Sequence, residues 1–287
     1  MKLIWSFILL LQVNHAVSQT ARRKILDKQT NFPIPFTTIK ILHAPKGEIA
    51  SINGEFELNI DAADSVLFSC VGYQQKIIIG KEIGTEIYLE PQIKTIEAVT
   101  VKDKKWIRTI ILGNIDKKIK GDVNWRLTEY GKDEFAQKIE LPDSLLFYKI
   151  NKIYIPVKKH IRWGPLLLHI YSADTVSEYP GEKLLIKPIY IKSRDVQDNK
   201  LVIDISSENL ILHHSKSFFV GISSIQDTVT EKGLSTLLLS KSSDAQTYSR
   251  TLYSTSFAWF PFGLMMDRSK NPYSARTYYS VDVDEMK

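Results

Sequence analysis

The segment Gly47-Glu48-Ile49-Ala50-Ser51-Ile52-Asn53-Gly54-Glu55-Phe56-Glu57-Leu58 combines a turn signal with alternating polar and apolar residues. Asn53-Gly54 is typical of a two-residue hairpin turn, in which both central residues adopt positive φ. Beyond the turn, Phe56, Leu58 and Ile60 share one face of an extended chain, and the polar residues between them share the other. The segment therefore predicts a tight hairpin followed by a half-buried strand from Phe56 to Ile60.

Short apolar segments and turn signals continue on both sides of this hairpin. We expect further strands over 36–42, 66–71, 77–79 and 86–89. Gly72 follows one of them, at a point where a positive φ is expected. Evenly spaced strands without a helical stretch predict a β-sandwich. Its core should contain Phe56, Leu58, Phe68 and Tyr73, each contributing roughly 2 to 4 kcal/mol relative to Ala.

Five pieces of residues 21–101 occur in an order typical of one domain family. They are Asp27-Lys28-Gln29-Thr30, Pro33-Ile34-Pro35, the Gly47–Leu58 hairpin, Ser69-Cys70-Val71-Gly72-Tyr73 and Thr95-Ile96-Glu97-Ala98-Val99-Thr100-Val101. In these pieces the chain resembles the carboxypeptidase-regulatory-like domain. The resemblance implies a seven-stranded, transthyretin-like β-sandwich of the prealbumin type, found in exported proteins of the Bacteroidetes kind and without catalytic groups of its own. We assign this domain to residues 19–101.

The β pattern returns in the second half of the chain. Residues 102–141 are expected to connect two domains and to belong partly to the second, with a strand over 107–112 and a short helix or a loop over 129–138. Further strands are predicted over 145–157, 166–171, 183–192, 200–205 and 217–225. The apolar runs Leu201–Ile205 and Phe218–Ile222 predict strands covered on both faces. Residues 142–287 should form a jelly-roll-like or Ig-like β-sandwich, so the whole chain is expected to be all-β.

The first eighteen residues have the order of a secretory signal peptide. Lys2 precedes the apolar run Leu3–Leu11, and Ala16-Val17-Ser18 precedes the expected cleavage site. The apolar run is too short to span a bilayer, so we expect no transmembrane segment in the mature chain. Cys70, the single cysteine, cannot form an internal disulfide and is expected to be a small buried residue. We therefore expect an exported protein of the periplasm, outer cell surface or extracellular space.

The charge pattern gives no sign of a nucleic-acid partner. The formal net charge is +6, but lysines are scattered among acidic residues, and the longest basic patches are Lys102–Lys105 and Lys117–Lys120. Binding to nucleic acid would require these charges to be concentrated on one face with stacking aromatic residues. Solvated surface charge is the better interpretation.

Motifs for several kinds of catalysis are missing from the sequence. None of the six histidines belongs to a His-Glu-x-x-His or His-x-x-Glu motif, and the neighbours His213-His214 would point to opposite faces of a strand. Gly221-Ile222-Ser223-Ser224-Ile225 lacks the second glycine of a nucleophile elbow. The thirteen glycines are dispersed and form no phosphate-binding loop. We expect no metal, cofactor or catalytic residue.

Two other functions remain open from the sequence. A glycosidase needs only two carboxylates brought together by the fold, and the candidates are Asp174, Glu178, Asp204 and Glu208. A carbohydrate-binding protein would present aromatic rings that stack on sugars, and the candidates are Trp163, Tyr171, Tyr179, Trp259, Phe260 and Tyr278. The segment Phe257–Met266 predicts either a buried closing strand or an exposed sticky loop. If it is exposed, Trp163, Trp259, Phe260 and Phe262 would form a ligand or partner surface.

The sequence therefore favours an exported, non-catalytic accessory, structural or binding protein. It does not identify the partner, for which a protein or a glycan of the cell envelope is the candidate. A carbohydrate-binding protein and an unrecognised hydrolase are the alternatives. The residues expected to support the fold are Asn53, Gly54, Phe56, Leu58, Phe68, Gly72 and Tyr73.

Overall fold

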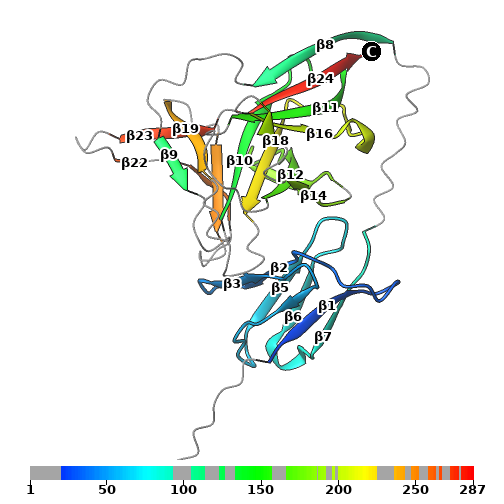
Figure 1. Cartoon of the computed structure of the whole chain (residues 1–287), viewed down its shortest axis with the longest axis vertical. Coiled ribbons are helices and arrows are strands. Elements are labelled where there is room, and N and C mark those ends of the chain that lie inside the picture. The colour runs from blue at the N-terminus through cyan, green and yellow to red at the C-terminus, as the bar shows by residue number, and fades with distance from the viewer. Residues whose placement is uncertain are drawn as a thin grey trace, which may run out of the picture.

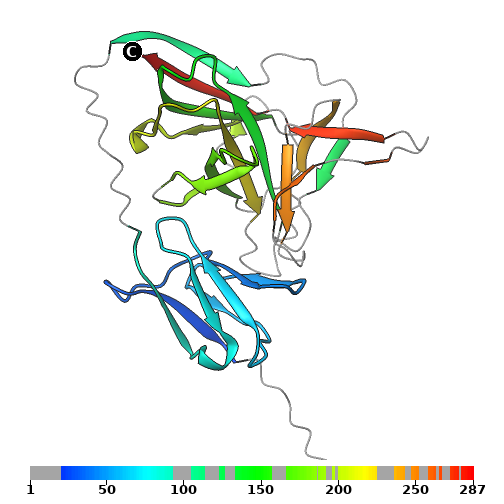
Figure 2. The same cartoon turned by 180° about the vertical axis from the view of Figure 1, so that it is seen from behind.

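The computed structural model describes residues 21–92, 105–113, 123–126, 133–156, 166–185, 187–191, 196–197, 200–224, 236–242, 247–251, 258–262, 265–266, 272–277 and 279–287. In these residues the chain is all-β, with two short 3-10 turns, η2 (Gly80–Glu82) and η5 (Ser206–Glu208). No helix among them is long and apolar enough to cross a bilayer. The expected signal peptide lies outside the described residues. Figures 1 and 2 show two bodies stacked along the long axis of the molecule, with β1 to β7 in one of them.

The first unit, residues 21–92, contains seven strands in two sheets. Its strands are β1 (Arg23–Asp27), β2 (Thr38–Ile41), β3 (Lys46–Ile49), β4 (Glu55–Phe56), β5 (Ser65–Ser69), β6 (Lys76–Ile79) and β7 (Glu86–Leu89). The sheet orders are β4-β1-β7 and β3-β2-β5-β6. Side chains from both sheets form one buried core that includes Ile25, Ile39, Phe56, Phe68 and Leu89.

The turn at Gly54 connects the two sheets and not two neighbouring strands. β3 pairs with β2, whereas β4 pairs with β1. The Gly54 N–H donates to the Ser51 carbonyl (2.9 Å), and the Ser51 N–H donates to the Glu55 carbonyl (2.8 Å), which closes a three-residue loop. In such a loop only the last residue needs positive φ, and Gly54 has φ +71° while Asn53 does not. The predicted two-residue turn is therefore wrong, because the Ser51 hydroxyl also accepts the N–H groups of Asn53 and Glu55 and holds the longer loop.

The strand predicted from Phe56 to Ile60 is shorter than expected. β4 ends at Phe56 because its partner β1 begins at Arg23, the residue opposite Phe56. Beyond that point the chain remains anchored, since the Arg23 guanidinium donates to the Leu58 carbonyl (3.0 Å). Leu58 and Ile60 still pack on the core formed around Phe56. Hydrophobic alternation thus predicted the buried face but not the length of the ladder.

The end of β5 is fixed by a glycine and a tyrosine. Gly72 has φ +82°, in the left-handed region expected there. Tyr73 is partly buried, and its hydroxyl donates to the Asp27 carboxylate (2.9 Å). The same carboxylate accepts the N–H groups of Gln29 and Thr30 (2.7 and 2.9 Å) and so fixes the turn after β1. Cys70 is buried beside these residues, and burial raises the pKa of its thiol.

The second unit, residues 105–287, contains the remaining strands. These are β8 (Trp106–Gly113), β9 (Val123–Arg126), β10 (Asp133–Glu140), β11 (Phe147–Pro156), β12 (Leu166–Ala173), β13 (Pro180–Lys183), β14 (Ile189–Ile191), β15 (Val196–Gln197), β16 (Lys200–Asp204), β17 (Ile211–Leu212), β18 (Ser217–Ser224), β19 (Thr236–Ser242), β20 (Thr247–Thr251), β21 (Phe260–Pro261), β22 (Met265–Met266), β23 (Pro272–Thr277) and β24 (Ser280–Met286).

Three sheets organise the second unit. A seven-stranded sheet has the order β13-β12-β18-β10-β20-β21, with β14 also paired to β12. A six-stranded sheet has the order β15-β16-β11-β24-β8, with β17 also paired to β11, and a four-stranded sheet has the order β22-β23-β19-β9. The main core contains Phe135, Ile170 and Val220 from the seven-stranded sheet and Ile153 and Val283 from the six-stranded sheet. The seven-stranded and six-stranded sheets therefore face each other across this core.

Several strand predictions for this unit need correction. The helix or loop predicted over 129–138 is wrong from Asp133 onward, because this stretch is β10, paired on both sides by β18 and β20. The strand predicted over 183–192 is two separate strands, β13 and β14. Leu201–Ile205 is not covered on both faces, since Asp204 is exposed. Phe218–Ile222 is buried throughout, as predicted, because apolar clusters lie on both faces of β18.

The two units contact each other through apolar side chains. Phe36 of the first unit packs edge-to-face on Tyr190 of the second, with ring centroids 5.0 Å apart. Ile49 and Leu167 complete this cluster. Phe36 has φ +54°, a costly conformation for a residue other than glycine. The backbone next to the contact is thus held in a conformation that the isolated segment would rarely adopt.

Gly54→Val should destabilise the first unit. A Cβ at this position would lie 2.7 Å from the Ile25 carbonyl oxygen, and the positive φ adds strain for any side chain. We expect a loss of at least about 2 kcal/mol in the free energy of unfolding. Urea unfolding followed by far-UV circular dichroism measures it, since residues 21–92 contain no tryptophan. Gly84→Val is the matched control, because an added Cβ would meet its nearest atom, the Glu86 carbonyl oxygen, at an ordinary contact distance of 3.9 Å, and it should change stability by less than about 0.5 kcal/mol. Equal losses in the two variants would contradict the interpretation.

Candidate functional site

A polar cluster lies on the outer face of the seven-stranded sheet, where the second unit approaches the first. In β12, Leu168 and Ile170 point into the main core. Successive side chains of a strand point to opposite faces, so His169 and Tyr171 lie on the outer face. Both are buried, with 3% and 1% of their surface exposed. This outer face is therefore covered, although it lies outside the main core.

Strand register brings the other members of the cluster to the same place. Glu134 of β10 is directly opposite Arg250 of β20 on one side and Ser223 of β18 on the other. Lys183 of β13 is opposite Tyr171 of β12. Side chains that are directly opposite in an antiparallel pair share a face. Five strands therefore contribute one polar side chain or more to a single surface.

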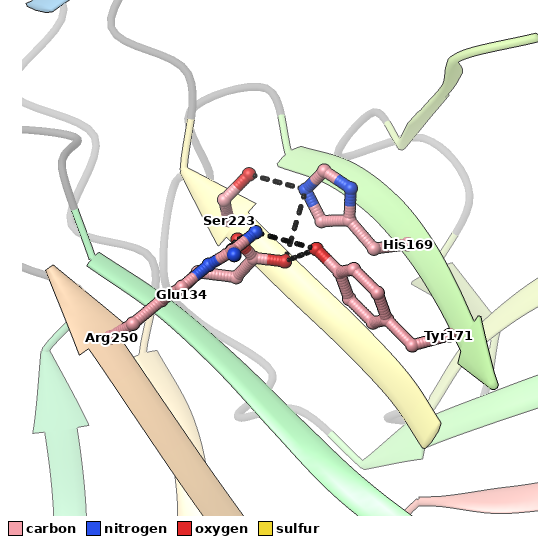
Figure 3. A network of polar contacts seen from close by, with 5 residues as sticks. All are labelled: Glu134, His169, Tyr171, Ser223 and Arg250. Atoms are coloured by element: carbon pink, nitrogen blue, oxygen red, sulfur yellow. Dashed lines mark hydrogen bonds and ion pairs between the residues drawn. The ribbon is translucent and has the colours of Figure 1, made fainter. Parts of the chain in front are cut away.

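Glu134 is the centre of the contacts in this cluster (Figure 3). The Arg250 guanidinium donates two hydrogen bonds to Oε2 of Glu134, from Nε (2.9 Å) and Nη2 (2.7 Å). The Tyr171 hydroxyl donates to Oε1 of Glu134 and accepts from Nη2 of Arg250 (2.9 Å for the latter). The guanidinium also lies over the Trp259 ring, 4.4 Å from its centroid. The buried carboxylate is therefore compensated by one cation and one hydroxyl.

His169 joins the cluster through one ring nitrogen. Its Nε2 lies 2.9 Å from the Ser223 hydroxyl oxygen and 3.6 Å from Oε1 of Glu134 (Figure 3). Its Nδ1 is buried and has no hydrogen-bond partner among the described residues. The histidine therefore has both of its polar neighbours on the same nitrogen.

Gly221 makes the cluster sterically feasible. It lies opposite His169 and Ala136, in the strand between β12 and β10. A Cβ at this position would lie 3.2 Å from Cε2 of Tyr171. Without that Cβ, the tyrosine can cross the face of β18 and reach Glu134, as Figure 3 shows. A larger residue would push the tyrosine away from the carboxylate.

Burial and charge pairing set the protonation states of the cluster. Burial is the largest single effect on the pKa of Glu134 and would raise it, but Arg250, His169, Lys183 and the Tyr171 hydrogen bond together lower this pKa to about 2. Burial lowers the pKa of His169 to about 3, with partial opposition from Glu134. Burial also lowers the pKa of the Lys183 ammonium, which the Glu134 charge opposes. At neutral pH the carboxylate is thus ionised and the imidazole is neutral.

Two cavities border the cluster, and residues of both units line each of them. The smaller, about 30 Å³, lies between Phe36 and Cys70 of the first unit and His169, Ser223 and Arg250 of the second. The larger, a groove of about 580 Å³, is lined on one side by Leu67, residues 69–75 and Gln92, and on the other by residues including Tyr171, Glu182, Lys183 and Arg250. Lys183, Arg250, Cys70 and Val71 line both cavities.

The arrangement of Ser223, His169 and Glu134 differs from that of a hydrolytic triad. In a triad the serine and the carboxylate bind opposite nitrogens of the imidazole, so that the acid orients the ring while the base accepts the serine proton. Here both groups lie at Nε2, and Nδ1 of His169 has no partner among the described residues. The cluster therefore lacks the alignment needed to activate the serine.

The acids proposed from the sequence lie in turns or, for Asp204, at the end of a strand. Asp174 accepts hydrogen bonds from the N–H groups of Val176 and Ser177, and Glu178 forms an exposed ion pair with Lys138. Asp204 accepts hydrogen bonds from Ser206, and Glu208 lies in η5. These contacts fix local turns and do not assemble a pair of carboxylates.

His213 and His214 are not in a strand, so the condition for their pointing to opposite faces is not met. His213 and His214 follow β17, in a bend where His214 has φ +54°, so their rings lie 3.6 Å apart and do not point to opposite faces. His213 stacks on Phe147. Among the described residues, no three His, Cys, Asp or Glu side chains gather in a way that could hold a metal ion.

Two of the aromatic residues considered for a ligand surface are buried. Trp259 and Phe262 have 8% and 9% of their surface exposed, so at these positions the buried alternative holds. Trp259 packs against Tyr171 and Arg250, and Phe262 packs against Phe135. Phe260 is half exposed. Trp163 and Tyr278 lie outside the described residues. Tyr179 is partly buried against the cluster that contains Trp259.

Glu134, His169, Lys183 and Arg250 are not among the site residues predicted from the sequence. One signal was available, because His169 is a titratable residue inside the apolar run of residues 166–171. Its partners could not be identified in the same way, since Arg250 lies 116 residues from Glu134 in the chain.

Comparisons with known proteins assign no relative to the chain. The sequence matches no protein-family model and no curated protein. Solved structures with weak likeness include the infectious bursal disease virus VP2 subviral particle, at 11% identity and a TM-score of 0.25, covering 92% of this chain and 62% of that one. The Gx strain structure of the same virus has 9% identity and a TM-score of 0.26, covering 88% and 60%. The chain thus spans about three fifths of these proteins, and scores this low support no inference about fold or function.

Arg250→Met should destabilise the protein strongly, because Glu134 would stay buried without its cation. We expect a loss of about 3 to 5 kcal/mol in the free energy of unfolding, measured by urea titration with tryptophan fluorescence. The double variant Glu134→Gln/Arg250→Met should recover most of this loss. Arg22→Met, which removes an exposed pair with Glu57, should cost less than about 1 kcal/mol. The interpretation fails if Arg250→Met is no more damaging than Arg22→Met.

Mild acid should destabilise the protein through His169. The folded pKa of about 3 lies below the model-peptide value of 6.5, so between these values the unfolded chain binds a proton that the folded chain excludes, and stability falls as the pH decreases below about 6.5. Between pH 7.5 and 5.5 the wild type should lose about 1 kcal/mol more than His169→Gln. Urea titrations at both pH values measure this, with His214→Gln as an exposed control. An unchanged pH dependence in His169→Gln would rule out this role. Glu134 acts in the same direction at lower pH, since its folded pKa is about 2.

Proposed function

We propose that this chain is a non-catalytic binding protein that holds a small ligand in the groove between its two units. The main observation in support of this proposal is the size of the groove. Its volume of about 580 Å³ lies within the range of roughly 300 to 1,000 Å³ that is usual for small-molecule sites. Both units contribute to its walls, so a bound ligand would contact residues that are far apart in the chain.

The chemistry beside the groove favours binding over catalysis. The Glu134 charge is engaged by Arg250 and Tyr171, which leaves it poorly suited to act as a general base. His169 shares one nitrogen between Ser223 and Glu134. A rigid, compensated cluster of this kind can hold the wall of a site in a fixed shape.

We also propose that the protein acts in the cell envelope after export. The pattern of residues 1–18 supports export, and the resemblance of residues 21–101 to carboxypeptidase-regulatory-like domains supports an accessory role. Seven strands in two sheets agree with the transthyretin-like β-sandwich that this resemblance implies. The second unit would then supply the charged residues of the ligand site, Glu182, Lys183 and Arg250.

A carbohydrate ligand is the second candidate. The groove is bordered by the side chains of Gln74, Gln75 and Gln92, whose amides both donate and accept hydrogen bonds as sugar hydroxyls require. A sugar would bind in the groove and not on Trp259, because the Trp259 ring is buried.

A thermal-shift screen tests the proposal. The purified protein is melted with a panel of monosaccharides, disaccharides, amino acids and dipeptides, and a bound compound should raise the melting temperature in proportion to its occupancy. Gln75→Trp, which fills the groove, should abolish the shift. Gln29→Trp, an exposed substitution in the turn after β1, should preserve it.

Chromatography of each compound after incubation should show it unchanged. Turnover of a compound, or a shift that persists in Gln75→Trp, would contradict the proposal. A panel in which no compound raises the melting temperature would contradict it for these ligand classes.

A further inference from the structure

Two cationic side chains lie on the inner wall of the groove. Lys183 and Arg250 line both the groove and the small cavity behind it. Lys183 is directly opposite Tyr171 across β13 and β12, so the two side chains share the outer face of the sheet. The Lys183 ammonium is therefore directed toward the same wall as the Arg250 guanidinium.

The nearby acids do not remove this positive character from the groove. Glu134 contacts Arg250 and lies behind it, outside the groove lining. Glu182 does line the groove, but it is exposed and adjacent to Lys183 in β13, so alternation directs it to the opposite face of the strand. Asp133 borders only the small cavity. Within the described residues, the charged residues of the groove wall are thus two basic ones, Lys183 and Arg250, and one acidic one, Glu182.

The opposite wall of the groove is uncharged and mixes apolar residues, such as Leu67 and Val71, with three glutamines. Gln74, Gln75 and Gln92 of the first unit are exposed and line it. An amide side chain offers two donors and an acceptor, which suit hydroxyl or peptide groups and give no preference for charge. The groove is therefore asymmetric, with cations on the second unit and amides on the first.

We propose that the groove binds a small molecule with one carboxylate, held by Lys183 in front of Arg250, and with uncharged polar groups held by the glutamines. This inference rests on the proposed function and specifies its ligand class. Hydrogen bonds between an ammonium and a carboxylate are shorter and about twice as strong as neutral ones. A sugar acid and a peptide carboxyl terminus both supply this chemistry.

Isothermal titration calorimetry with matched probes tests the inference. Glucuronate and N-acetylglycylglycine represent the two sources, and glucose and the amide of N-acetylglycylglycine are their neutral counterparts. At least one acid should bind at least tenfold more tightly than its neutral counterpart. The preference should decrease between 50 and 500 mM salt, because the contact is partly exposed. The acid that binds more tightly identifies the source.

Substitutions at position 183 test whether Lys183 is responsible for the preference for acids. Lys183→Gln should weaken acid binding about tenfold, as the loss of one charge-assisted hydrogen bond predicts. Lys183→Arg should retain most of the affinity for the acid. Lys200→Gln, an exposed lysine on β16 in the other sheet, should bind as the wild type does. Melting temperatures measured in parallel separate a loss of binding from a loss of folding.

The outcomes separate this inference from the proposed function. Neutral probes that bind as tightly as the acids, with binding lost in Gln75→Trp, would overturn the carboxylate preference and leave the groove as the ligand site. Equal effects of Lys183→Gln and Lys200→Gln would also overturn it. If no probe of either kind binds, both the inference and the proposed function fail for these ligands.

Discussion

The buried pair of Glu134 and Arg250 is the constraint on which the outer face of the second unit depends. A carboxylate removed from water must be compensated by a cation and by hydrogen bonds, or the fold loses several kcal/mol. Arg250 of β20 and the Tyr171 hydroxyl of β12 supply this compensation on the two sides of β10. The pair therefore fixes the relative positions of three strands and the orientation of the side chains that face the first unit.

The neighbouring residues of the site are arranged around the Glu134–Arg250 pair. Gly221 has no side chain, so Tyr171 can cross β18 to the carboxylate, and the guanidinium of Arg250 lies over the Trp259 ring. Val71 of the first unit belongs to the main core of the second, while Phe36 packs on Tyr190 close by. Apolar contacts hold the units together, and the polar cluster shapes the cavity that remains between them. The groove is thus a product of two folded surfaces and is not encoded in either segment alone.

Sequence reasoning predicted the features that depend on neighbouring residues. The all-β class, the positive φ of Gly54 and the buried run Phe218–Ile222 follow from local composition and alternation. β10 was misread because its buried Glu134 and Gln137 break the apolar pattern and have their partners on distant strands. Gln137, for example, bonds the backbone of Tyr279, 142 residues away. The candidate site was missed for the same reason, since pairing between distant polar residues leaves no local signal in a single sequence.

The parallel pairing of β1 with β7 has a mechanical consequence. The chain enters the first unit through β1 and leaves it through β7, and the two strands are aligned from Lys24 opposite Glu86 to Asp27 opposite Leu89. Tension applied at the two ends of this unit would load the ladder in shear, so its hydrogen bonds would resist together and would not open one by one. Hairpin strands pulled from adjacent ends would instead unzip. A unit with this connectivity is suited to transmit force along a tether without unravelling.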